Sequence, residues 1–235
     1  MPYRAKRCWI RSATATTKPT TISAGSLIIG GAGTAGTGAL SIATNSVFDY
    51  ASSASQTLSG AITGSGSLTK SGNGTLTLTG ATLSYVGQTT VLAGRLNLAG
   101  GRSAPLGTSS VKVNAGAILN FNNTVGQAVA LGAGVLDLGA GASGSASLGF
   151  DIGSLAAFDR ISSTSAALAA NRVIINLTGL TGLTAGSYDL LTAASGLASA
   201  AMNSAPSPGA SAAAAGSMRL WCARPARPRA STASH

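Results

Sequence analysis

Few residues of this chain can take part in acid–base chemistry. Its five acidic residues are all aspartates, it has no glutamate, and its one histidine, His235, is the last residue. General acid–base catalysis requires a pair of carboxyl groups or a histidine beside the substrate. Asp151 and Asp159 are close enough in sequence to approach each other, and Asp189 is a third candidate. Any catalytic hypothesis therefore depends on these three aspartates.

The same carboxylates also have a structural explanation. Acidic side chains at strand ends cap turns or pair with arginines, and Arg160 and Arg172 lie close by in the sequence. A Ser-His-Asp triad is not expected because His235 lies in a terminal tail, and no His/Cys cluster with metal-ligand spacing is present. We therefore predict a non-enzymatic protein with no catalytic residue, no cofactor and no metal. A polysaccharide-cleaving enzyme that uses aspartates is the alternative.

A glycine-rich motif also has both a functional and a chance explanation. The segment from Gly31 to Gly36 fits the G-x-G-x-x-G pattern of dinucleotide-binding loops. With 32 glycines among 235 residues such matches arise by chance, and a second one runs from Gly139 to Gly144. A nucleotide site also needs a helix after the loop, whereas residues 39–42 are expected to form a strand. The motif does not predict a cofactor.

The elements that must position these residues are short strands. Residues 75–79 alternate threonine with leucine, and residues 95–98 repeat the alternation twenty residues later. Period-two alternation predicts strands with one buried face, here the face of Leu76 and Leu96. A threonine row on the opposite face can bind ice or a polysaccharide, but it is more often a solvated strand face. The outward threonines are Thr75, Thr77 and Thr79.

Leucines mark a longer period along the chain. Successive markers are 17 to 23 residues apart, which is the length that one turn of three short strands and their bends requires at ~3.3 Å per residue. Glycine and asparagine occupy positions where the chain must bend, as at residues 72–74. The predicted fold class is all-β, a parallel β-solenoid whose rungs bury inward aliphatic side chains against one another. The marker residues are Leu58, Leu76, Leu96, Leu119 and Leu136.

Strands are also expected on both sides of these markers. Before them, two short apolar runs are separated by a glycine-rich turn, and after them a series of apolar runs is expected to form the closing rungs. The early runs are 26–29 and 39–42, and the late runs are 148–152, 157–161, 171–177 and 186–192.

Composition divides the chain into a body and two unlike ends. Aromatic residues make up only 4% and charged residues only 9%, so the surface must consist largely of Ser, Thr, Asn, Gly and Ala. Nine of the fifteen basic residues lie in 1–21 and 218–235, which contain no acid. We predict a basic N-terminal segment at 1–21 that is disordered or misassigned in reading frame. A β-helix domain follows at 22–192, with its repeat core at 60–101, and 193–235 is an Ala/Ser/Pro/Arg-rich disordered tail.

Charge and hydropathy exclude several classes of partner. The net charge of +10 does not indicate nucleic-acid binding, because the body is nearly neutral. The two cysteines, Cys8 and Cys222, lie in the ends, so the body does not report a redox compartment. The basic start is not followed by the uninterrupted apolar stretch of a signal peptide. Residues 26–42 are apolar on average but broken by glycines, so no transmembrane helix is expected.

Two stretches, 64–80 and 85–96, resemble the autotransporter-associated β-strand repeat, also called the passenger-associated transport repeat. The family pattern is G-x-L-x-K-x-G-x-G-T-L-x-L-x-G, a short gap, and Y-x-G-x-T-x-V-x-x-G-x-L. Thr82-Leu83-Ser84 stands where the family more often has Asn-Thr. The matching residues are Leu68, Lys70, Gly72, Gly74, Thr75, Leu76, Leu78, Gly80, Tyr85, Gly87, Thr89, Val91, Gly94 and Leu96.

Residues 150–191 are also similar to the region that follows such repeats. Together the resemblances imply a secreted or bacterial cell-surface passenger, associated with the outer membrane, with a right-handed parallel β-helix. They imply a non-catalytic scaffold, stalk or adhesion surface in which the repeat assists export and stacking. The implied partners are surface glycans or a host or neighbouring cell surface, and a β-barrel translocator located elsewhere or lost.

Overall fold

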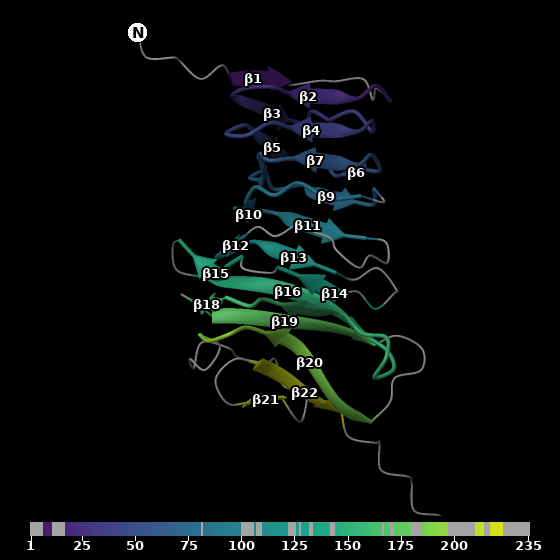
Figure 1. Cartoon of the computed structure of the whole chain (residues 1–235), viewed down its shortest axis with the longest axis vertical. Helices are drawn as coiled ribbons and strands as arrows, with labels where there is room; N and C mark the ends of the chain where they lie inside the picture. Colours follow the sequence, from purple (N-terminus) through teal and green to yellow (C-terminus); the bar gives the residue numbers. More distant parts are fainter. Residues whose placement is uncertain are drawn as a thin grey trace, which may run out of the picture.

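The structure is a computed structural model in which parallel strands stack as a β-solenoid (Figure 1). The predicted fold class is therefore confirmed, while its right-handed sense stays a prediction. Strands, turns and bends make up the described part of the chain, which contains no helix. The described residues are 7–10, 17–80, 82–99, 106, 110–121, 126, 128–131, 134–141, 144–165, 167–169, 172–179, 185–196, 210–213 and 217–222.

Several coils of the solenoid pass through three sheets in turn, although not every coil has a strand in each sheet. In the first coil of the predicted repeat core, β7 (Ile62–Gly64) belongs to sheet B, β8 (Ser67–Lys70) to sheet A and β9 (Thr75–Leu78) to sheet C. Each of these strands is parallel to the strand of the same sheet in the preceding coil. Stacking in the solenoid is thus a ladder of main-chain hydrogen bonds on three sides.

The strands of each sheet follow one another along the axis of the solenoid. Sheet A contains β1 (Arg7–Ile10), β3 (Ser26–Gly31), β5 (Val47–Ser52), β8, β10 (Thr89–Val91), β12 (Val111–Asn114), β15 (Leu136–Ala140) and β18 (Ala167–Ala169). Sheet C contains β6 (Gln56–Leu58), β9, β11 (Arg95–Leu98), β13 (Ile118–Asn120), β16 (Ser145–Ile152) and β19 (Arg172–Gly179). Sheet B contains β2 (Thr20–Ile22), β4 (Leu40–Ile42) and β7. Sheet D contains β14 (Ala128–Ala130), β17 (Arg160–Ser162), β20 (Gly186–Thr192), β22 (Ser217–Cys222) and β21 (Ala210–Ala213).

The core consists of inward side chains that stack in columns through the coils. The first column of sheet C joins register partners whose side chains are completely buried: Leu76, Leu96, Leu119 and Leu148. These leucines alternate along their strands with outward polar residues, as the period-two pattern predicted. Burial of each such side chain contributes roughly 1.5–3 kcal/mol to folding.

Two markers of the predicted period were misplaced, since Leu58 is the register partner of Leu78 and not of Leu76. Leu136 lies in sheet A, where it pairs with Val111, and not in sheet C. The true partner of Leu119 in sheet C is Leu148 on β16, the strand that follows β14 and β15. The coil between Leu119 and Leu148 is longer than its predecessors, and a count of residues between leucines cannot report which sheet a strand joins.

The C-terminal coils close differently from the others. Strand β20 pairs in parallel with β17 but is antiparallel to β22. The Tyr188 hydroxyl on β20 donates a 2.9 Å hydrogen bond to Gly153 O, and its ring meets Phe158 edge to face at 5.2 Å between centroids. These buried contacts hold the turn between β16 and β17 against β20.

The predicted ends fall mostly outside the described residues, so the domain boundaries stay a prediction. The described parts of the ends include β1, which pairs with β3, and β22, which pairs with β20. These two strands contain the backbones of Cys8 and Cys222 and lie at opposite ends of the solenoid (Figure 1). In the described part of the chain, no helix has the length and apolar character to span a membrane.

Candidate functional site

The repeat-like segment joins two successive coils, and its motif residues lie where these coils touch each other and their neighbours. It runs through β8 and β9, passes Leu83, which bridges to Ile62 of β7, and continues through β10 and β11. The leucines of the motif face the core, the outward threonines of β9 are partly exposed, and Thr79 after the strand is exposed, as predicted. The polar and glycine positions of the motif remain to be explained.

Lys70 is a buried cation inside the solenoid. Its side chain has an exposed fraction of 0% and occupies an inward column of sheet A between Tyr50 and Val91. The ammonium group donates to Gly72 O of its own coil and to Ala93 O of the next coil, the latter at 3.3 Å. Lys70 therefore connects the corners of two coils from within.

Two nearby residues set the electrostatics of Lys70. The ammonium group lies 5.7 Å from the centroid of the Tyr50 ring, which is within cation–π range. Burial lowers the pKa of Lys70, and the charge of Asp49 opposes this shift. Burial in turn raises the pKa of Asp49, while a 2.6 Å hydrogen bond from the Ser71 hydroxyl and the charge of Lys70 oppose the rise. The acid and the base of this corner thus stabilise each other's charged form.

Tyr85 and Thr89 form a buried polar pair at the next corner. Both side chains are completely buried, and their hydroxyl oxygens are 2.6 Å apart. Burial raises the pKa of Tyr85 to about 12, and the hydrogen bond with Thr89 opposes the rise. The pair spans the approach to β10, so it sets the path by which the chain enters sheet A.

Glycines occupy the corners where backbones of successive coils meet. A Cβ atom on Gly80 would lie 2.1 Å from the carbonyl oxygen of Gly60, and one on Gly60 would lie 2.2 Å from that of Gly38. A Cβ atom on Gly87 would lie 2.1 Å from the carbonyl oxygen of Gly66. The same close approach recurs at Gly72, Gly74 and Gly94. Any larger residue at these positions would separate the coils.

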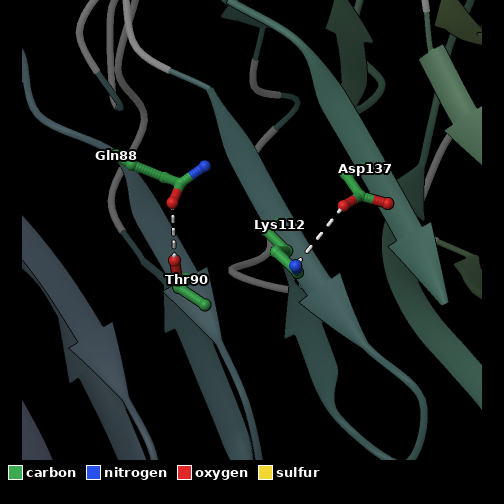
Figure 2. Close-up of polar contacts among 4 residues, drawn as sticks. All are labelled: Gln88, Thr90, Lys112 and Asp137. Carbon is green, nitrogen blue, oxygen red and sulfur yellow. Dashed lines mark hydrogen bonds and ion pairs between the residues drawn. The ribbon is translucent and has the colours of Figure 1, made fainter. Parts of the chain in front are cut away.

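The outer face of sheet A carries a short polar array (Figure 2). Thr90 on β10 donates a 3.3 Å hydrogen bond to the Gln88 amide oxygen, and Lys112 on β12 forms a 3.7 Å ion pair with Asp137 on β15. An ion pair this exposed contributes only about 0–1 kcal/mol. Figure 2 shows these residues as two separate pairs, in which Gln88 points toward Thr90 and Lys112 points toward Asp137.

The candidate aspartates lie inside the closing coils. Asp159 Oδ2 accepts a 2.6 Å hydrogen bond from the backbone N–H of Asp151, and the Asp159 N–H donates to Asp151 O at 2.9 Å. Both side chains are buried, whereas Asp189 on β20 is half-buried. The structure thus brings Asp151 and Asp159 together, with Asp159 bound to main chain. The predicted absence of catalysis stays a prediction.

The glycine-rich motif leads into a strand. Gly31 is the last residue of β3, and the residues up to Gly36 are succeeded by β4, so the helix that a nucleotide site requires does not follow the loop. Within the described residues, no group of three His, Cys, Asp or Glu side chains could hold a metal ion. Leu106, Phe121 and Ile161 are among the residues around an apolar space in the interior that leaves no room for a water molecule.

Two polar residues had no role assigned from the sequence, one inside the solenoid and one on the first strand of sheet C. Lys70 was matched to the family pattern without a role, because charged residues are normally placed at the surface. Gln56 was not singled out at all. Its amide accepts a 2.6 Å hydrogen bond from Ala35 N and donates to Ala35 O, so it occupies both main-chain groups as a neighbouring strand would. No signal in the local sequence distinguishes Gln56 from a surface glutamine.

Comparison with known proteins identifies the segment described above. Residues 68–98 match the model of the Passenger-associated-transport-repeat family, which confirms the predicted resemblance. No curated protein and no solved structure matches the chain. The repeat and the β-solenoid fold together fit the passenger of an autotransporter.

Proposed function

We propose that this chain is a non-catalytic stalk or spacer of an autotransporter passenger, displayed at the bacterial surface or secreted. In this proposal the repeat directs the stacking of coils during export. One observation carries it: the characteristic residues of the repeat contact neighbouring coils. Lys70 donates to carbonyls of two coils, and Gly80 allows its coil to approach the previous one.

Such residues have a specific use in a solenoid. Because each coil resembles the next, a strand that stacked one coil out of place would still bury its leucines. A buried ammonium group that found no carbonyl acceptors would cost several kcal/mol, so Lys70 disfavours misplaced stacking. This penalty matters most while a chain is folding segment by segment as it emerges from a membrane. A translocator is the partner that the proposal implies.

The surface favours a spacer over an adhesion surface for glycans. Sugar-binding surfaces use exposed aromatic rings, which offer an apolar face with a polar rim. Among the side chains described by the structure, every aromatic one is buried: Phe48, Tyr50, Tyr85, Phe121, Phe150, Phe158 and Tyr188. The polar array around Lys112 and Asp137 is the alternative contact surface for a glycan, but its side chains bind one another.

The enzymatic alternative would use the aspartates of the closing coils. A polysaccharide-cleaving site needs carboxyl groups that reach a substrate. Asp151 and Asp159 are buried, and Asp159 already accepts a main-chain hydrogen bond, so a structural role accounts for the observed position. We therefore retain the scaffold as the proposed function.

Export of the chain from a bacterial cell tests the proposal. The chain would be placed between a signal peptide and an autotransporter β-barrel, and surface display would be measured as cleavage by external protease on intact cells. We expect the parent and Thr77→Ala, an outward change, to be displayed equally, and Gly80→Val to be retained inside the cell. Equal display of Gly80→Val in a native fold would contradict the proposed role of the repeat.

A further inference from the structure

The turn between β8 and β9 contains a dipeptide that is prone to spontaneous chemical change. Asn73 precedes Gly74, and it is the only asparagine of the chain that is followed by glycine. In an unstructured Asn-Gly segment the glycine nitrogen attacks the asparagine amide carbon, because glycine has no side chain to hinder the approach. Asn73 is exposed, whereas Gly74 is buried. The turn therefore presents a reactive amide beside a nucleophile that the fold encloses.

The reaction would convert this turn in two steps. The Gly74 nitrogen forms a bond to Asn73 Cγ and loses its proton, and the side-chain nitrogen leaves as ammonia, which produces a five-membered succinimide ring. Water then opens the ring at either carbonyl. One opening gives aspartate with the original main chain. The other gives isoaspartate, in which the main chain runs through Cβ and Cγ and is one carbon longer.

Hydrogen bonds from both neighbouring coils hold the main chain at this peptide bond. The Gly74 N–H donates to Ser52 O of the preceding coil at 3.1 Å. Gly74 O accepts from the Arg95 N–H of the next coil at 3.4 Å. Ring closure would turn the Gly74 nitrogen away from Ser52 O and toward the side chain of Asn73. Stacking therefore opposes the reaction, because the hydrogen bond to Ser52 must break first.

Close packing adds a second restraint. A Cβ atom on Gly74 would lie 2.0 Å from Ala54 O, so the Gly74 backbone already lies against the preceding coil. On the other side, a Cβ atom on Gly94 would lie 2.6 Å from Gly74 O and 2.9 Å from the carbonyl carbon of Asn73. The peptide unit between Asn73 and Gly74 is therefore enclosed by two coils and cannot rotate while both are stacked.

We propose that Asn73 is a deamidation site that is closed by the stacking of the coils, so that only a chain with this corner unstacked is modified. An unfolded chain has neither the hydrogen bond to Ser52 nor the contact with Gly94, and its Gly74 nitrogen is free to attack. The isoaspartyl product then cannot restack, because its extra main-chain carbon would fall where Gly74 meets Ala54 O. Deamidation thus leaves a covalent record in chains that stayed unstacked.

Incubation of the full chain in mildly alkaline buffer, with and without a denaturing concentration of guanidinium chloride, tests the closure. Peptide mapping by mass spectrometry and enzymatic methylation of isoaspartate report conversion at Asn73. We expect conversion to be at least about tenfold slower in the folded protein, because it requires a rare opening of the corner. A synthetic peptide of residues 69–78 provides the intrinsic rate in each buffer. Equal rates for the folded protein and the peptide would overturn the proposal.

A matched pair of glycine variants tests whether the next coil provides the protection. Gly94→Ala places a methyl group against the peptide unit of Asn73 and Gly74, whereas Gly116→Ala places one where no atom lies within 4 Å. Both glycines have a positive φ, +66° and +82°, so the backbone strain of the two variants is similar. We expect Gly94→Ala to deamidate faster than the parent in native buffer, and Gly116→Ala to deamidate at the parent's rate.

Equal deamidation of the two glycine variants would contradict closure by the next coil. If Gly94→Ala lost its strand content by circular dichroism, the comparison of the folded parent with the peptide would decide. Asn73→Gln is the control for the assignment, because closure of its larger ring is far slower and the fast conversion in denaturant should disappear.

Refolding of the modified chain tests the consequence. Chains with isoaspartate at position 73 would be separated by chromatography from the parent and refolded by dilution. Asn73→Asp is the matched control, because it has the same added charge on an unchanged main chain. We expect Asn73→Asp to melt at the parent's temperature, since the side chain is exposed, and the isoaspartyl chain to melt lower or to stay unfolded. Equal melting temperatures would show that the corner accepts the extra carbon, and the proposed consequence would be wrong.

Discussion

Lys70 and Tyr50 are register partners on adjacent coils, and the Lys70 ammonium group lies 5.7 Å from the centroid of the Tyr50 ring inside the solenoid. The Tyr50 hydroxyl donates to Ala54 O at 3.0 Å, and Lys70 donates to Gly72 O and Ala93 O. The two residues thus perform the same task in consecutive coils, each satisfying carbonyls at the corner between sheets A and C.

The titration of Lys70 predicts a rise of stability with pH. Burial lowers the folded-state pKa of Lys70 below its ordinary value of 10.5, so the unfolded chain holds this proton more tightly. Below the folded pKa the folded state carries the full cost of the buried charge, and that cost is relieved as pH rises from the folded pKa toward 10.5. Urea denaturation of the parent should therefore show increasing stability in this window, and Lys70→Met should lack the increase.

Lys112→Met is the matched control for this measurement. Lys112 is half-buried on the outer face of the same sheet and pairs with Asp137. Its replacement should leave the alkaline rise unchanged. An alkaline rise of the same size in Lys70→Met and in the parent would show that the rise has another source.

Tyr85 predicts the opposite behaviour at higher pH. Burial raises its pKa to about 12, so stability is fully present below pH 10 and is lost as pH rises toward 12. At 1.36 kcal/mol per unit, the loss from this one group is roughly 3 kcal/mol. Tyr85→Phe should abolish this part of the alkaline loss, measured as the free energy of unfolding on either side of pH 10.

The Tyr85–Thr89 hydrogen bond can be isolated by a double-mutant cycle. Tyr85→Phe alone leaves the buried Thr89 hydroxyl unpaired and should cost about 1–3 kcal/mol at neutral pH. Tyr85→Phe combined with Thr89→Val removes both partners and should recover part of this loss. Additive single effects would mean that the two hydroxyls do not depend on each other.

Gly80→Ala should destabilise the solenoid by about 3 kcal/mol or more, because the new methyl group would lie 2.1 Å from the carbonyl oxygen of Gly60. The backbones of the two coils cannot move apart to accept the methyl group without increasing the distance between the coils. Gly179→Ala is the control, since its Cβ would meet no atom within 4 Å. Thermal denaturation compares the two, and equal melting temperatures would show that the corner adjusts to the methyl group.

The inward leucines were the part of the fold most open to prediction. Leu76 and Leu96 alternate with polar residues on strands only four residues long, and this pattern alone determines which face is buried. The assignment of strands to sheets was less accessible, as Leu136 demonstrates. The lengths of the turns between strands decide which sheet each strand enters. The residues at these turns are those that permit close backbone approach, and they do not recur at a fixed spacing in the sequence.

The polar positions could be matched to a family but not explained from the sequence. Lys70 faces inward because carbonyl groups of two corners meet around its ammonium group, and that meeting exists only once the coils are stacked. The approach of Gly80 to Gly60 is likewise a contact between coils. A contact between coils joins residues far apart in the sequence, so a short stretch of sequence does not reveal it.

The buried carboxylate of Asp159 provides the last prediction, which also separates the two functional hypotheses. Asp159 Oδ2 accepts the Asp151 N–H at 2.6 Å in a buried site, and a hydrogen bond to a charged group contributes about 1.5–3 kcal/mol. Asp159→Asn keeps the shape but replaces the carboxyl group by an amide whose oxygen is the weaker acceptor, so the free energy of unfolding should fall by up to that amount. Asp137→Asn, which changes only an exposed ion pair, should cost less than about 1 kcal/mol. If Asp159→Asn instead kept the parent's stability and abolished a measurable cleavage of polysaccharide, Asp159 would be a catalytic residue, and the scaffold would be the wrong hypothesis.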